Sequence, residues 1–364
     1  MQVFHVAEGD IREGAELPGS APAHGFIWIA CTRAELQANL PALQACLQAV
    51  AGAPLVDLHV SDLMNLQLPS RHDFTRDYDL MVFRQLAPPS ASTRADDPPR
   101  RRSGPVALRH IDTLPVGCVV FDRLLLSVHP EGCAVREAFV ARLRPAAGDG
   151  QPGLALSRAP LNAADLMLRL VSLMVDAYLA LRRDLSRQLD HWQAELLAPR
   201  TRFANWSALL DARLALHGLN EICEDQRTAL LDWSSAVDTW PLEPSPSAQR
   251  ERDLLKVRSR DVQEHVERVV RHVQRLENQI ETTVQMHFNA QSHRTNEIMR
   301  TLTALTAVFL PLNLITGFFG MNFEYLPLVH RETGLWWAIG IMTAVAIGFA
   351  LVLWRKRYLA RTSQ

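Results

Sequence analysis

The chain has 364 residues, a formal net charge of −1, 48% apolar and 21% charged residues. These averages are those of an ordinary globular protein of two or three domains. The five cysteines occur without CxxC spacing, which argues against a cysteine metal site and is typical of reduced thiols in a cytosolic domain. The HExxH, GxSxG and P-loop motifs are absent, so we expect no enzymatic activity.

Residues 1–245 predict an α+β domain, and its polar N-terminus has no apolar core of the kind found in signal peptides. A helix is expected over 32–50, because Thr32 and Glu35 have the spacing of a capping box. A second helix is expected over 57–66. Three β-rich runs complete the sheet-forming part of the domain, at residues 25–30, 78–86 and 116–130.

Residues 87–105 are rich in proline, serine and charge, which predicts a surface loop or a disordered insertion. The loop contains three consecutive arginines at 100–102. A solvated loop is the favoured interpretation of this run, and we expect no nucleic-acid partner.

From about residue 163 the α+β domain is expected to be helical, and three prolines near residue 245 end that part. No proline or glycine occurs from 248 to 310, which predicts one long stalk helix over 246–300 that continues into the next segment. Apolar residues along it recur at spacings of 4 and 3, as in the a and d positions of a coiled coil: Val262, Val266, Val269, Val273, Leu276 and Ile280.

Residues 301–319 and 335–354 contain no charged side chain. Each is close to the roughly 20 residues that a helix needs to cross a bilayer, so we predict two transmembrane helices with an external loop at 320–334. The tail at 355–364 holds four cations and is expected to be cytoplasmic. Both termini are then cytoplasmic, and the protein is expected in the bacterial inner (plasma) membrane.

The segment TNEIMRTLTALTAVFLPLNLITGFFGMNFEYLP resembles the pore-helix signature of the CorA family of divalent-cation transporters, whose GMN triplet is Gly320-Met321-Asn322 here. The proline in mid-span, the second span and the short basic tail agree with the family. The segment LHVSDLMNLQLPSRHDFTRDYDLMVF resembles the family's N-terminal region in weakened form. The magnesium/cobalt channels and the zinc-transporting ZntB branch share this layout.

The resemblance implies a homopentameric funnel in the lipid bilayer that takes up divalent cations, with Mg²⁺ as the first choice and Co²⁺ or Ni²⁺ as further cargo. It implies no catalytic cofactor, and the divalent cation is both the cargo and a regulatory ligand. A ZntB-type Zn²⁺ transporter, which could be coupled to protons, is the alternative. A membrane-anchored coiled-coil scaffold is a more remote one.

Seven residues lie at intervals of 3, 3, 4, 4, 3 and 4, and so form one helix face that leads to the triplet. This face resembles the family's pore lining: Asn296, Met299, Leu302, Thr306, Leu310, Asn313 and Gly317. Its apolar side chains are expected to form constrictions that gate by dewetting. Asn322 is expected at the external entrance, and Glu324 and Glu332 are expected to attract cations weakly. Leu328 stands where many family members have an acid.

Asp261 and Asp62 match the positions of acidic residues that bind regulatory Mg²⁺ between subunits in the magnesium channels. Ser61 replaces a second acid that the family often has, and two solvated surface carboxylates are the alternative interpretation. His265 and His272 are seven residues apart and share a helix face, which keeps the zinc alternative open, although a packing role is favoured.

Overall fold

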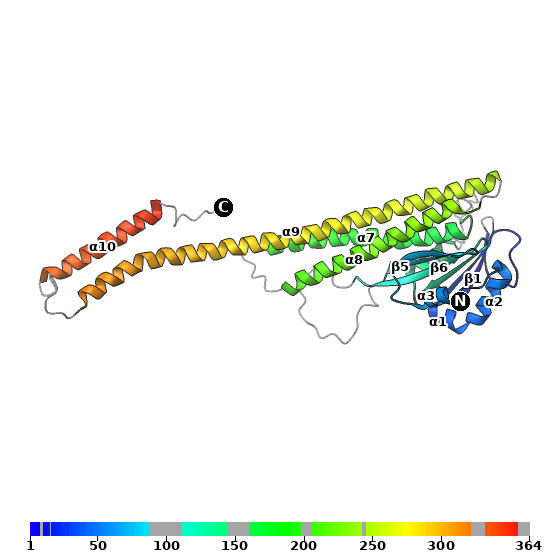
Figure 1. Ribbon diagram of the computed structural model, residues 1–364, viewed down its shortest axis with the longest axis horizontal. Helices are drawn as coiled ribbons and strands as arrows, with labels where there is room; N and C mark the ends of the chain where they lie inside the picture. Colours follow the sequence, from blue (N-terminus) through cyan, green and yellow to red (C-terminus); the bar gives the residue numbers. More distant parts are fainter. Residues whose placement is uncertain are drawn as a thin grey trace. The chain divides into compact units, whose positions relative to one another are not determined.

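The computed structural model describes residues 1–7, 10–14, 16–87, 111–143, 160–197, 206–241, 245–321 and 332–355. The chain forms an N-terminal unit, Met1–Thr282, and a C-terminal unit, Thr283–Gln364. Figure 1 shows the elements of both in sequence colours. The predicted loop at 87–105 falls almost entirely outside the described residues.

The N-terminal unit is built on a mixed seven-stranded sheet with the order β2-β1-β3-β7-β6-β5-β4. The central pair β3 and β7 is parallel, and the other neighbours are antiparallel. The three predicted β-rich runs are confirmed, and the last of them is a hairpin. The strands are β1 (Gln2–Ala7), β2 (Asp10–Gly14), β3 (Phe26–Thr32), β4 (Arg71–Phe74), β5 (Asp79–Leu86), β6 (Thr113–Val120) and β7 (Leu124–His129).

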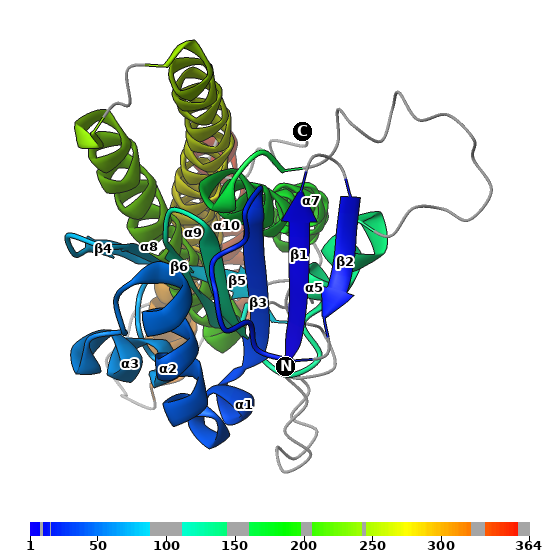
Figure 2. The same cartoon turned by 90° about the vertical axis from the view of Figure 1, so that its right-hand side faces the viewer.

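Both faces of the sheet are covered, which explains why the central strands are mostly apolar. Alternate residues of β3, such as Ile27 and Ile29, join a core beneath the three N-terminal helices α1 (Arg33–Ala38), α2 (Leu40–Ala51) and α3 (Asp57–Met64) (Figure 2). On the opposite face Trp28 stacks on Phe4 and meets Phe139 edge to face. Helices α5 (Ala134–Leu143), α7 (Ala163–Leu197) and α8 (Trp206–Thr239) complete the unit together with the first part of α9 (Pro246–Phe319).

The predicted capping box is present at the start of α1. The Thr32 hydroxyl accepts a hydrogen bond from the Glu35 amide at 3.2 Å, and the Glu35 carboxylate accepts one from the Thr32 amide at 2.8 Å. The prediction of one helix over 32–50 is wrong, because the chain breaks at Asn39 into α1 and α2. Pro41 explains the break, since it has no amide hydrogen to continue a helix through this point.

The apolar stripe of α9 is buried within the N-terminal unit itself: its six side chains are at most 3% exposed. Trp233 of α8 donates to Ser259 at 3.2 Å, and His272 lies 2.8 Å from Ser186 of α7. Asp165 at the start of α7 also binds Arg258 of α9 at 2.9 Å. The a/d-like pattern therefore reports packing against helices of the same chain.

A chain of polar side chains crosses the core next to α5. Ser127 accepts from Trp28 at 2.8 Å and lies 2.8 Å from His129, whose Nδ1 is 3.6 Å from the Cys133 sulfur. Burial, with Arg136 and Arg33 as smaller causes, lowers the pKa of His129 to about 3. The histidine is therefore neutral in the folded chain at every pH above that value.

This burial predicts an acid-sensitive step in stability. Between pH 6.5 and 3 the unfolded chain binds a proton at His129 that the folded chain does not bind, so stability falls as pH falls through this window. The slope from this group is up to about 1.4 kcal/mol per pH unit. In urea unfolding of the full chain at a series of pH values, His129→Gln should lose about that slope. Equal slopes in the two proteins would contradict the assignment.

Candidate functional site

In the C-terminal unit the predicted pore face lies on one uninterrupted helix. The seven residues are Asn296, Met299, Leu302, Thr306, Leu310, Asn313 and Gly317, and all lie on α9 and are exposed in the single chain. Leu310 is 71% exposed and Leu302 is 56% exposed. Residues outside the row, such as Leu314, are equally exposed, so in the membrane this part of α9 is covered by lipid or by other copies of the chain.

Thr306 is the one hydroxyl in this row. Its Oγ1 donates to the Leu302 carbonyl at 2.8 Å, one turn earlier in the helix. Because the hydroxyl hydrogen is used within the helix, the oxygen is left as an acceptor. Its lone pairs suit the water molecules of a hydrated cation.

The helix ends at the triplet. The Gly320 amide donates to the Thr316 carbonyl at 2.9 Å, and the Met321 amide reaches the Phe318 carbonyl at 3.4 Å. A Cβ on Gly320 would lie 3.1 Å from the Thr316 oxygen, so glycine relieves a tight approach at this turn. Asn322 and Glu324 lie outside the described residues, as does the side chain of Glu332 at the start of the next helix.

Among the described residues, one helix is long and apolar enough to cross a membrane. It is α9, whose most apolar window of 18 residues has a mean hydropathy of 1.8 and is 6% buried. Helix α10 (Glu332–Arg355) contains a shorter apolar run at Trp336–Val352. The second predicted span stays a prediction.

The two predicted regulatory residues lie in different parts of the N-terminal unit. Asp261 is on α9, 63% exposed, with its Oδ1 3.9 Å from His265. Asp62 is on α3, and its side chain is 12% exposed. The two carboxylates are thus carried by different helices, α9 and α3.

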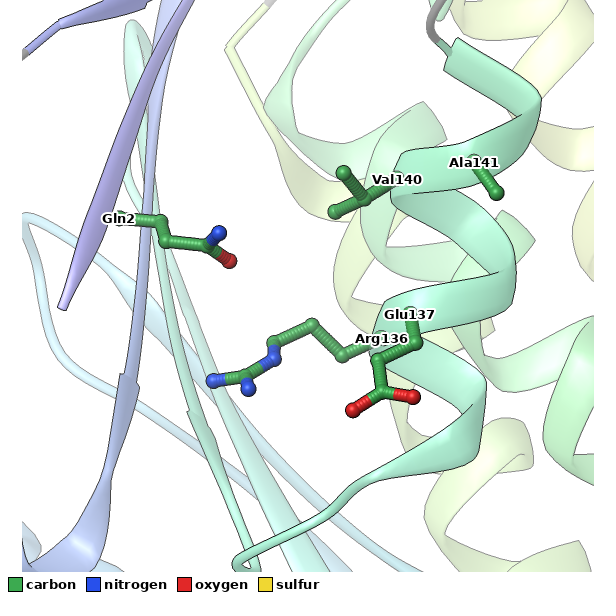
Figure 3. Close-up of a pocket in the computed structure, with 5 residues that line it drawn as sticks. All are labelled: Gln2, Arg136, Glu137, Val140 and Ala141. Carbon is green, nitrogen blue, oxygen red and sulfur yellow. The ribbon is translucent and has the colours of Figure 1, made fainter.

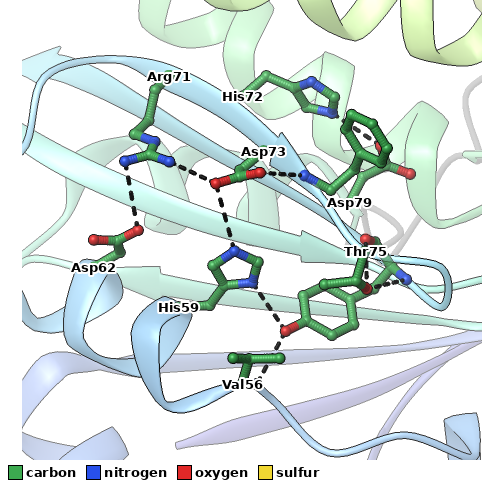
Figure 4. Close-up of polar contacts among 10 residues, drawn as sticks. Val56, His59, Asp62, Arg71, His72, Asp73, Thr75 and Asp79 are labelled. Carbon is green, nitrogen blue, oxygen red and sulfur yellow. Dashed lines mark hydrogen bonds and ion pairs between the residues drawn. The ribbon is translucent and has the colours of Figure 1, made fainter.

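Asp62 already has a cation beside it, which sequence reasoning missed. Arg71 of β4 places Nη1 3.8 Å from Asp62 Oδ2 and Nη2 2.5 Å from Asp73 Oδ2 (Figure 4). The same Asp73 oxygen lies 3.6 Å from His59 Nε2. The polar run Arg71-His72-Asp73 lacks the apolar residues that predict a strand. It lies close to α3 because it forms β4 at the edge of the sheet.

Tyr78 fixes the orientation of His59. The Tyr78 hydroxyl accepts from the Val56 amide at 3.0 Å and lies 2.9 Å from His59 Nδ1. Asp73 is an acceptor and lies 3.6 Å from Nε2, which favours the ring proton on Nε2; Nδ1 then accepts from the Tyr78 hydroxyl. Burial raises the pKa of Asp73, but hydrogen bonds from the Phe74 amide and from Arg71 outweigh it and lower the pKa overall.

No group of three or more histidine, cysteine or acidic residues is arranged to hold a metal ion within the ranges that the structure describes. His272 is turned toward Ser186 of α7, and burial lowers its pKa, with Arg182 and Arg275 as smaller causes. His265 instead lies beside Asp261. The two predicted histidines therefore have different surroundings.

A cavity of about 290 Å³ lies between β1 and α5 (Figure 3). Gln2, Arg136, Glu137, Val140 and Ala141 line it. Its lining carries both signs of charge, so it favours neither a cation nor an anion.

These features define a protein with an α+β domain, a long helix that runs from that domain to Gly320-Met321, and a second apolar helix. A profile of the CorA-like Mg²⁺ transporter protein family matches residues 99–357, well over half of the chain. The chain therefore belongs to this family, which confirms the resemblance inferred from the sequence. The family consists of membrane transporters and not of enzymes.

Two relatives and one structure illustrate the likeness. The cobalt/magnesium transport protein CorA of Thermotoga maritima is 29% identical over 100 residues, 28% of each chain. The putative metal ion transporter YfjQ of Bacillus subtilis is 41% identical over 63 residues, 17% of this chain and 19% of that protein. The matched segments thus span less than a third of these relatives.

The complete structure of the CorA magnesium transporter from Methanocaldococcus jannaschii aligns over 97% of both chains, with a TM-score of 0.69 and 16% identity. At this identity the likeness is one of fold. It confirms the predicted order of an α+β domain, a long helix and a C-terminal helix.

Proposed function

We propose that the chain is a subunit of a channel for divalent cations, with Mg²⁺ as the main cargo and Co²⁺ or Ni²⁺ as further ions. The observation that carries the proposal is the exposed row on α9, which runs without interruption from Asn296 to the turn at Gly320-Met321. Five copies around one axis would stack this row into rings. The family membership supports the same assembly.

The row supports passage of a hydrated ion. Its polar members are neutral amides and one hydroxyl, and no carboxylate lies along it. Mg²⁺ loses its waters reluctantly, so neutral oxygens that hydrogen-bond the hydration shell suit it better than ligands that strip it. Asn322 is proposed to form the first such ring, with Glu324 and Glu332 concentrating cations outside it.

The arrangement in the membrane follows from the same proposal. Residues 301–319 and 335–354 cross the inner membrane, the loop at 320–334 faces outward, and both termini are cytoplasmic. Passive entry is favoured by about 2.3 kcal/mol per charge for each 100 mV of membrane potential. The cytoplasmic domain, residues 1–245, then lies where it can respond to the internal cation concentration.

Asp261 of one subunit and Asp62 of the next are proposed to share regulatory cations that hold the channel closed. Asp261 is 63% exposed, so its carboxylate is accessible to a neighbouring subunit. Loss of the ions would leave carboxylates that repel, which shifts the population toward an open state.

The alternatives are not equally supported. A ZntB-type Zn²⁺ transporter keeps some support from His265 beside Asp261 on the stalk, since imidazole and carboxylate are zinc ligands. The coiled-coil scaffold is less well supported. The apolar stripe of α9 that would have formed the coiled-coil interface is buried, and α9 is bonded to α7 and α8 of the same chain.

Subunit counting tests the pore. Native mass spectrometry of the full chain, purified in detergent, should show five copies, because rings around a conducting axis need a closed assembly. A dimer or a monomer would contradict the channel and return the scaffold to consideration.

A further inference from the structure

Asp62 is the less exposed of the two proposed regulatory carboxylates, and its charge is incompletely satisfied. Its Oδ2 is buried and has no hydrogen-bond partner in the described part of the chain. The nearest cation is the Arg71 Nη1 at 3.8 Å, which is an ion pair longer than a hydrogen bond. Asp62 therefore depends on Arg71 for its local counter-charge.

Arg71 is held more tightly by another group. Its Nη2 lies 2.5 Å from Asp73 Oδ2, and Asp73 is itself held by the Phe74 amide at 2.9 Å and by His59 at 3.6 Å (Figure 4). The guanidinium can thus give up Asp62 without losing its close partner. This is the arrangement expected of a cation that another cation can displace.

A divalent ion that approaches Asp62 meets the positive charge of Arg71 a few ångströms away. Like charges at this separation repel, and the partly buried surroundings of Asp62 screen them less than bulk water would. The repulsion raises the ion concentration that is needed to occupy the carboxylate.

We propose that Arg71 is a built-in cation that competes with a divalent cation for Asp62, and so sets the cytoplasmic concentration at which the regulatory site fills. Arg71 acts through Asp62 and is a positioning residue. The inference rests on the proposed regulation at Asp62 and Asp261, but its test measures ion binding and not transport, so failure of one is distinguishable from failure of the other.

The experiment is a Mg²⁺ titration of the full chain in detergent, with the thermal midpoint of the N-terminal unit as the readout. The Mg²⁺ concentration for half of the stabilising effect should fall about tenfold in Arg71→Gln, which removes the competing charge. Arg71→Lys keeps the charge and should stay near the wild type. Arg76→Gln removes an exposed arginine from the turn before β5 and is the matched control, which should leave the concentration unchanged.

Two further variants keep the test decisive if Arg71→Gln fails to fold. Asp73→Asn removes the close partner of Arg71, so the guanidinium pairs with Asp62 alone and the half-effective Mg²⁺ concentration rises. Asp77→Asn removes an exposed acid nearby and should not raise it equally. In Asp62→Asn the concentration should no longer respond to Arg71→Gln.

Two outcomes would overturn the inference. If the half-effective Mg²⁺ concentration is the same in the wild type, Arg71→Gln and Asp73→Asn, Arg71 does not compete with the cation. The proposed regulatory site would not be contradicted by that result. A thermal midpoint that does not change with Mg²⁺ in any variant would overturn both the regulation at Asp62 and the role of Arg71. The proposed channel would then still be tested separately, by its Mg²⁺ flux.

Discussion

Asn322→Ala is expected to reduce Mg²⁺ uptake into proteoliposomes to the level of protein-free vesicles. The proposed ring of amide oxygens is the first protein group to meet the hydration shell. Alanine has no side-chain oxygen that could accept hydrogen bonds from that shell. A loss of at least a hundredfold, roughly 2.7 kcal/mol, is the order expected when several equivalent ligands disappear at once from the proposed pentamer. The loss is measured as Mg²⁺ uptake into the vesicles, reported by a fluorescent dye inside them.

Thr343→Ala is the matched control for this change. Thr343 lies on α10 and its hydroxyl donates to the Ile339 carbonyl at 2.7 Å, so it is a polar residue whose hydrogen is used within its own helix. Its replacement should leave uptake at the wild-type level. Full uptake by Asn322→Ala, with the protein correctly assembled, would show that the triplet is not the entrance.

Leu310→Ser is expected to make the channel leak when the cytoplasmic Mg²⁺ concentration is high. Leu310 is the most exposed of the apolar residues in the row. In the proposed pentamer, five leucines around the axis would exclude water from a narrow passage, and serine hydroxyls would keep it wet. Cation flux under conditions that close the wild type should rise roughly tenfold or more.

The same substitution two residues later gives the control. Leu312 lies at a similar depth on α9 but on a different side of the helix, because two residues correspond to about 200° of rotation. Leu312→Ser should therefore leave the closed state tight. A leak of equal size in both variants would indicate general damage to the membrane unit, and no leak in either would contradict a dewetted gate at Leu310.

The sequence predicted the long elements well, since their signals are repeated many times. The stripe from Val262 to Ile280 recurs over five helical turns. Because no proline or glycine occurs from 248 to 310, the sequence predicted a continuous helix there, and the structure has it as α9. The central strands were equally clear, because burial on both faces makes β3 and β7 mostly apolar. Helix α9 ends at Phe319, the last residue of the predicted segment 301–319.

Short elements with polar residues escaped the sequence analysis. Strand β4 has four residues, three of them charged or histidine, and it exists because β5 and α8 give it a place at the sheet edge. The break at Asn39 needed only one proline to override a good helical pattern. Arg71 could not have been assigned to Asp62 from spacing, because their contact joins an edge strand to a separate helix.

Uptake of Mg²⁺ and Zn²⁺ into liposomes that contain the wild-type protein, with and without a pH gradient, tests the central claim most directly. The account predicts Mg²⁺ uptake that is driven by the membrane potential and does not depend on the pH gradient. Zn²⁺ uptake that grows with the gradient would contradict the assignment of the ion and favour the ZntB-type alternative. No uptake of either cation would contradict the channel itself.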